Sequence, residues 1–262
     1  MRKIQWWCLI AWVPGCVLAG GFTPATFADW LRLRAGEGGK AVDWYAEGRV
    51  LNDRTGERLS NMEGLDASWI FEDKTRPGTW VQLSRKIFIA LDPKTGQLMS
   101  GADGKLRRPT FYPFQVRTYR LDGDEIVYNV ESHDGARIFA EPEQRNFTVR
   151  RLGDVTHFNY AMFIDRVRFD GTRMQRFEVN DFFLRRGPRL RDEDRYQYTW
   201  TGTGPGPVVA TALSWRYSSF DAIPSARLKE FIRRQAPLWL APPRDMAEVD
   251  ALRQQQPYPL QN

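Results

Sequence analysis

The fold is decided by residues 42–71, VDWYAEGRVLNDRTGERLSNMEGLDASWIF. In the first part of this stretch Val42, Trp44 and Ala46 point to one side, and a more polar set between them points to the other. Alternation with a period of two is typical of a half-buried strand. Residues 52–57, NDRTGE, are typical of a turn, after which the chain returns through a second run. The stretch therefore predicts an antiparallel hairpin.

The alternating pattern continues to about Tyr217. It predicts further strands at residues 81–91, 114–121, 126–132, 136–141, 146–152, 157–169, 174–183, 196–200 and 208–220. Asp-Gly, a strong hairpin signal, occurs at 122–123, 134–135 and 170–171. Antiparallel strands without long crossovers indicate a barrel or a two-sheet sandwich. We predict an all-β fold, an antiparallel lipocalin-like β-barrel of about ten strands, with aromatic residues that fill the interior or line a cavity.

Helical patterning is confined to the two ends of the chain that follows the leader. Residues 29–35 predict a short N-terminal helix. Near the other end, Ser225 can cap a helix that Pro237 stops, and Asp245 with Glu248 forms a capping-box-like start for another. We expect these one or two C-terminal helices to lie across the outside of the sheet.

Residues 1–19 have the form of a secretory signal peptide: a basic start, an apolar stretch and then small residues. Val17 and Ala19 satisfy the small-residue rule, so we expect cleavage after Ala19, which would leave 243 of the 262 residues. Residues 20–262 would then form one β-barrel domain with a C-terminal helical segment over 224–262. The expected location is periplasmic or secreted.

A lipid anchor is the alternative for this leader. The motif VPGC, which ends at Cys16, is an imperfect lipobox that would leave a lipid-modified cysteine at the new N-terminus of a membrane-anchored lipoprotein. The apolar run is shorter than the roughly 20 residues that a bilayer-spanning helix needs. Because Cys8 and Cys16 both lie in the leader, the chain after Ala19 has no thiol.

The composition, 42% hydrophobic and 13% aromatic, is that of a globular protein and excludes a disordered or rod-like chain. The chain has 38 Lys and Arg against 32 Asp and Glu, and removal of Arg2 and Lys3 with the leader would lower the net charge from +6 to +4. The arginines are spread along the chain beside acids. They indicate a solvated surface, so we predict no nucleic-acid partner.

Motifs of common catalytic and cofactor sites are absent from the sequence, including G-x-S-x-G, H-E-x-x-H and C-x-x-C. Residues 201–207, TGTGPGP, resemble a glycine-rich loop, but Pro205 and Pro207 are incompatible with the helix of a dinucleotide site. A metal would need His133 and His157, which fall on separate elements. We therefore predict neither a metal nor a cofactor.

Glu47 and Glu63 are the candidate catalytic pair. A turn centred near Arg54 places Glu63 opposite Tyr45 and Glu47 opposite Asn61. The glutamates are then diagonal neighbours within about 5–8 Å. Each precedes a glycine, which lets another backbone or a ligand approach closely. Two such carboxylates can push their pKa values apart and serve as acid and base.

The alternative for this pair is a solvent face with Arg49 and Arg58 as counter-ions. The opposite face of the hairpin, which includes Trp44, is more apolar. If that face is the core, both glutamates lie outside, unless the barrel has a polar-lined cavity. A slip of one residue in the register would also separate them.

Five further residues are candidates for ligand binding: Trp44, Tyr45, Arg85, His157 and Trp215. Arg85 lies between Leu83 and Ile87 on the apolar side of its strand, where a charge needs a carboxylate partner or an anionic ligand. A bulge would instead place Arg85 and Lys86 at the edge. The alternative for Trp215 is a place in the core or at the rim.

Four segments carry a family resemblance: DWLRLRAGEGGKAVDWYAEGRV at 29–50, NMEGLD at 61–66, IFIALDPKTGQLM at 87–99 and IPSARLKEFIRRQAPLWLAPP at 223–243. Together they resemble the bacterial and fungal family called domain of unknown function 1838. The chain departs from that pattern at MSGADGKLRRPTFYP, where relatives often have a second Thr-Gly-Glu turn. The resemblance implies no activity and no catalytic residues.

These observations predict an exported β-barrel protein that binds a small, largely apolar or amphipathic ligand in an aromatic-lined cavity. Two alternatives stay open. One is a cofactor-independent isomerase, hydratase or cyclase that uses Glu47 and Glu63. The other is an envelope protein that binds a partner on its surface and has no pocket.

Overall fold

The computed structural model describes residues 21–36, 39–101, 103–132, 143–167, 173–204 and 206–255. The strands in these ranges are β1 (Val42–Asn52), β2 (Arg58–Glu72), β3 (Thr79–Leu91), β4 (Thr110–Asp122), β5 (Glu125–Ser132), β6 (Thr148–Leu152), β7 (Val155–Val167), β8 (Arg173–Arg185), β9 (Tyr196–Thr203) and β10 (Val208–Tyr217). The helices are α1 (Pro24–Arg34), α2 (Asp192–Arg195), α3 (Ala226–Gln235) and α4 (Met246–Gln254), with 3-10 turns η2 (Phe220–Ala222) and η3 (Pro237–Leu240).

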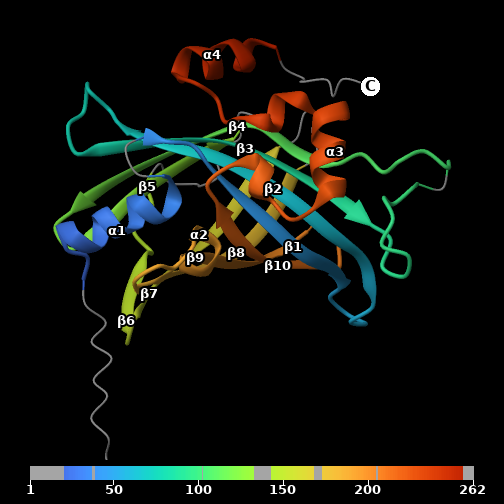
Figure 1. Ribbon diagram of the computed structural model, residues 1–262, viewed down its shortest axis with the longest axis horizontal. Coiled ribbons are helices and arrows are strands. Elements are labelled where there is room, and N and C mark those ends of the chain that lie inside the picture. Colours follow the sequence, from blue (N-terminus) through green and yellow to red (C-terminus); the bar gives the residue numbers. More distant parts are fainter. Residues whose placement is uncertain are drawn as a thin grey trace, which may run out of the picture.

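The strands form one sheet with the order β5-β4-β3-β2-β1-β10-β9-β8-β7-β6, and every neighbouring pair is antiparallel. Two meanders, β1–β5 and β6–β10, are joined where β1 pairs with β10, with Asp43 opposite Tyr217. The sheet curls into a half-barrel (Figure 1). The predicted all-β, lipocalin-like barrel architecture of about ten antiparallel strands is confirmed.

The β4–β5 hairpin falls at the predicted Asp122-Gly123 pair. Asp122 pairs with Glu125, and Gly123 has a φ of 63°, a left-handed conformation that favours glycine. Other sequence predictions fall outside the described residues, namely the leader 1–19 with Cys8 and Cys16, the strand at 136–141, the Asp-Gly pairs at 134–135 and 170–171, and His133.

An aromatic cluster fills one end of the concave side, next to α1. Trp30 of α1 is fully buried, and its ring centroid lies 4.8 Å from that of Phe147 and 5.1 Å from that of Phe182. Tyr128 on the edge strand β5 reaches Tyr160 of β7, with ring centroids 5.4 Å apart. Such pairs add about 0.5–1.5 kcal/mol each beyond the burial of their area. Side chains therefore bring the two edges of the sheet together at this end.

The convex face of the first meander is covered by the C-terminal segment, as Figure 1 shows for α3 and α4. Leu228 of α3 and Trp239 of η3 pack with Leu65 and Ile87 from the sheet. The indole Nε1 of Trp239 also donates to the backbone oxygen of Lys86 at 2.7 Å. This half of the sheet is therefore buried on both faces.

Both predicted C-terminal helices are present with their predicted caps. Ser225 accepts a hydrogen bond from the backbone N of Leu228 at 3.1 Å, and Asp245 accepts one from that of Glu248 at 2.8 Å. Helix α1 begins at Pro24, earlier than predicted, because two threonines form a capping box there. Within the described ranges, none of the helices has the length and apolar character needed to cross a bilayer.

Candidate functional site

A cavity of about 220 Å³ lies on the concave side of the curl, lined by strands of both meanders. Val50 of β1 and Ala210 of β10 place it toward the β1–β2 turn. Tyr198 of β9 lines the cavity and also stacks on Phe182, with ring centroids 4.7 Å apart. This tyrosine therefore separates the cavity from the packed aromatic cluster.

One wall of the cavity is aromatic. Phe88 of β3 and Trp200 of β9 line it, with ring centroids 6.1 Å apart. Phe88 occupies this position because Gly64 lies behind it: a Cβ there would come within 2.1 Å of the phenyl ring. The other glycine that follows a candidate glutamate, Gly48, sits where a Cβ would meet the carbonyl oxygen of Thr211 at 2.4 Å. Both glycines thus permit close approach within the sheet.

Three cations line the cavity: Lys86 of β3, Arg117 of β4 and Arg176 of β8. Glu178 also lines it and pairs with Arg176, with Nη2 and Oε1 2.7 Å apart. The Arg176 guanidinium lies over the ring of Trp200, 5.4 Å from its centroid, in a cation–π arrangement. The interior of the half-barrel is therefore strongly polar beside its aromatic wall.

Asp66 of β2 lies behind these cations in a buried charge cluster. Its Oδ2 is 3.2 Å from Nζ of Lys86 and 3.5 Å from Nη2 of Arg34. Burial favours the neutral carboxyl, but Lys86, Arg34 and Arg117 outweigh it and hold the pKa of Asp66 below its ordinary value. Burial, aided by repulsion from Arg117, lowers the pKa of Lys86 to about 8. Lys86 is therefore a cation that titrates just above neutral pH.

Several buried polar atoms in the cavity wall have no hydrogen-bond partner among the described residues. They are Oε1 of Gln115, Nε of Arg117, Nε of Arg176 and Nδ2 of Asn180. A buried donor or acceptor that loses its partner costs about 1–3 kcal/mol. Partners that enter the cavity can satisfy these atoms.

The two candidate glutamates are directly opposite each other, which corrects the predicted register. Glu47 pairs with Glu63 and Tyr45 with Leu65, instead of Tyr45 with Glu63. The register is offset by two residues from the expected one, and the pairing shifts between Val50 and Leu51. The face that carries the glutamates is the convex one, and neither lines the cavity. Both glutamates therefore lie outside the barrel, as expected if the apolar face of the hairpin is the core.

Each glutamate has partners from the protein. Glu63 is buried, accepts a hydrogen bond from Oγ of Ser225 at 2.6 Å and forms an ion pair with Arg227 of α3. Glu47 is exposed and accepts a hydrogen bond from the hydroxyl of Tyr45 at 2.7 Å. The counter-ion of Glu63 thus comes from α3 rather than from Arg49 or Arg58, and the interaction holds that helix on the sheet. Their catalytic role stays a prediction.

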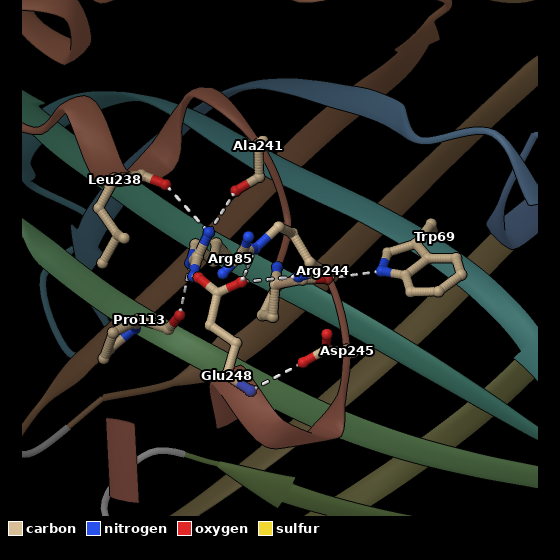
Figure 2. Close-up of polar contacts among 9 residues, drawn as sticks. Trp69, Arg85, Pro113, Leu238, Ala241, Arg244, Asp245 and Glu248 are labelled. Carbon is tan, nitrogen blue, oxygen red and sulfur yellow. Dashed lines mark hydrogen bonds and ion pairs between the residues drawn. The ribbon is translucent and has the colours of Figure 1, made fainter. Parts of the chain in front are cut away.

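Arg85 is buried on the convex face, where it holds the C-terminal segment. Its Nε donates to the carbonyl of Pro113 at 2.9 Å and its Nη1 to that of Ala241 at 2.8 Å. Nη1 also donates to the backbone carbonyl of Leu238 at 3.3 Å, and Nη2 forms an ion pair with the carboxylate of Glu248 in α4. Figure 2 shows these groups around the guanidinium. The carboxylate that a buried arginine requires therefore comes from the protein itself.

The remaining candidates also lie away from the cavity lining. Trp44 is fully buried in the aromatic core, and Trp215 stacks on Tyr45 across the convex face, with ring centroids 6.3 Å apart. His157 stacks on the ring of Phe183 at 5.0 Å, and its Nε2 lies 2.7 Å from Oδ1 of Asp181. The structure thus gives each of them protein neighbours, and their part in ligand binding stays a prediction.

The residues that line the cavity were missed because charge on the inner face of a strand resembles a solvated face in sequence. In residues 114–121, Phe114 and Val116 face outward beneath α4, while Gln115, Arg117 and Tyr119 face inward. The available signal was an arginine alternating with aromatic and amide residues.

In the ranges that the structure describes, His, Cys, Asp and Glu side chains form no cluster of three that could hold a metal.

No model of a known protein family matches this chain, and a search of curated proteins finds none that matches it either. The resemblance to the family called domain of unknown function 1838 therefore stays a prediction. What the fold and the cavity define is a half-barrel with a charged and aromatic interior hollow.

Proposed function

We propose that this protein is an exported binding protein that holds a small molecule with a largely apolar body inside its half-barrel. The observation that carries the proposal is the cavity of about 220 Å³, bounded by both meanders and walled on one side by Phe88 and Trp200. Antiparallel barrels of this strand number can enclose one small ligand.

The size of the cavity favours a compact ligand. Pockets for drug-sized molecules measure about 300–1,000 Å³. At about 220 Å³, this cavity suits one fused ring system better than a long acyl chain. The aromatic wall offers a flat surface on which such a ring can stack.

Export rests on the leader-like residues 1–19, and cleavage after Ala19 is compatible with the packing of Phe22. Phe22 is buried, stacks on Phe158 with ring centroids 6.1 Å apart, and donates its backbone N–H to the carbonyl of Asp124 at 2.7 Å. Phe22 follows the expected cleavage site at Ala19 in the sequence. Cleavage there would therefore spare these contacts.

The test uses the neutral aromatic probe 2-naphthamide and isothermal titration calorimetry. Ala210 lines the cavity, so Ala210→Phe fills it and should weaken binding at least tenfold. The matched control is Leu213→Phe on the same strand, where the side chain is 38% exposed and lies outside the cavity lining. This control should bind like the parent chain. Equal binding by Ala210→Phe would show that the ligand site is elsewhere.

A further inference from the structure

We infer that the ligand carries an ionised oxygen group, such as a carboxylate, and that Lys86, Arg117 and Arg176 hold this group inside the cavity. The inference rests on the proposed function and adds the chemical class of the ligand. That class is a compact amphipathic anion, with a flat apolar body at one end and a negative charge at the other.

The first argument is the charge in and beside the cavity. Among the described residues it consists of four cations and two carboxylates: Arg34, Lys86, Arg117, Arg176, Asp66 and Glu178. Glu178 is already paired with Arg176, and Asp66 forms ion pairs with Arg34 and Lys86 and also attracts Arg117. Arg117 is only 4% exposed and has no ion pair with a described carboxylate. Buried positive charge in excess is unfavourable unless an anion joins it.

The second argument is the set of unpaired atoms. Of the four buried polar atoms in the described cavity wall that have no partner, three are N–H donors, on Arg117, Arg176 and Asn180. The fourth is the amide oxygen of Gln115. An ionised oxygen group accepts several hydrogen bonds and donates none, so it is complementary to this excess of donors.

The third argument is the placement of the cations. Lys86 and Arg117 come from the adjacent strands β3 and β4, and Arg176 comes from β8 in the other meander. They therefore reach the same cavity from opposite walls of the curl. Arg176 also lies over the ring of Trp200, which joins the charged part of the cavity to its aromatic wall. A ligand with a charged end beside a flat ring would contact both parts at once.

The experiment compares two probes of the same shape, 2-naphthoate and 2-naphthamide, by calorimetry at pH 7 and low salt. The parent chain should bind the carboxylate at least tenfold more tightly than the amide. In Arg117→Met this preference should vanish, because the affinity for the carboxylate should fall at least tenfold more than the affinity for the amide. The control Arg49→Met removes the same charge from an exposed position on β1 and should keep the preference.

A second variant covers the case in which Arg117→Met does not fold. Asn180→Asp keeps the shape of the side chain and places a carboxylate where Nδ2 lacks a partner. It should weaken the binding of 2-naphthoate at least tenfold more than the binding of 2-naphthamide, and it should unfold at an equal or higher temperature. A purely structural role for Asn180 predicts no selective loss of the anion.

The outcomes separate the inference from the proposed function. If the parent chain binds both probes equally, or if Asn180→Asp keeps the preference for 2-naphthoate, the anion inference is overturned and the binding function stands. If the parent chain binds neither probe, the proposed function fails, and the inference falls with it.

Discussion

Lys86 and Asp66 form an ion pair beside the cavity, with Nζ and Oδ2 3.2 Å apart. The pair does not neutralise the site, because Asp66 is shared with Arg34 and Arg117 repels the ammonium of Lys86. Because the pKa of Lys86 is lowered to about 8, the positive charge available to a ligand depends on pH.

Binding of 2-naphthoate should weaken as the pH rises through about 8, because Lys86 has its pKa lowered to about 8 and loses its proton there. If only the protonated form binds, affinity falls by up to about tenfold per pH unit above that value. The charged groups that face Lys86 are Asp66 of β2, Arg34 of α1, Arg117 of β4 and Glu178 of β8.

Calorimetry over that pH range, with Lys86→Arg as the comparison, tests this expectation. A guanidinium does not titrate, so the variant should keep its affinity up to pH 10. If the parent chain and the variant lose affinity together, the titrating group is not Lys86.

Asp43→Asn should stabilise the fold at pH 8 by up to about 4 kcal/mol. Burial, followed by the charge of Asp66, raises the pKa of Asp43 from 3.8 to about 7. Between these two values the unfolded chain ionises while the folded one stays protonated, so the free energy of unfolding falls as the pH rises. Denaturation at pH 4, 6 and 8 measures the slope, which the variant should lose. Asp53→Asn, in the exposed turn, should keep it.

Glu248→Gln should lower the free energy of unfolding by about 2–4 kcal/mol, because it leaves the charge of Arg85 buried without a counter-ion. The side chains of Arg85 and Glu248 are 3% and 20% exposed. The control is Glu230→Gln, whose pair with Arg234 is on the surface, and its effect should stay within about 0.5 kcal/mol. Urea denaturation measures the free energy of unfolding of both variants. Equal losses in the two would contradict the role of Arg85 in holding the C-terminal segment.

Glu63→Gln should lower the melting temperature and leave the affinity for 2-naphthoate unchanged, because Glu63 holds α3 through Arg227 and lies outside the cavity. Glu47→Gln should do less, since Glu47 is exposed. Thermal unfolding and calorimetry on the same samples separate the two effects. If Glu63→Gln loses affinity or turnover without a change in stability, Glu63 acts in binding or catalysis and not only in holding α3.

Mass spectrometry of the protein from an exporting host should find a chain that begins at Gly20. Cys16→Ser should then leave the mature mass unchanged, because the leader is removed. A mature chain that begins with a lipid-modified Cys16, and that fails to form in Cys16→Ser, would support the lipoprotein alternative.

The hairpin at 42–71 could be predicted because alternation and turn residues are local signals. Its register could not, because the pairing shifts between Val50 and Leu51. The capping residues Ser225 and Asp245 marked both C-terminal helices, since a cap acts within a few residues of itself.

A cavity was predicted, but its lining residues could not be, because the first meander is covered on both faces. Alternation distinguishes the two faces of a strand but not inside from outside when both are apolar. Arg85 and Lys86 are neighbours in sequence, yet one holds α4 and the other lines the cavity. A shift in the β3–β4 pairing between Ser84 and Lys86 adds to the ambiguity.

The order of the strands also has a consequence for how the chain folds. Within each meander, successive strands are joined in sequence, so their hairpins can form early and independently. The pairing of β1 with β10 brings Asp43 next to Tyr217 and has by far the largest separation along the chain. Closing so long a loop is entropically slow. Substitutions in the β1–β10 seam should therefore change the folding rate more than equally destabilising substitutions elsewhere in the sheet.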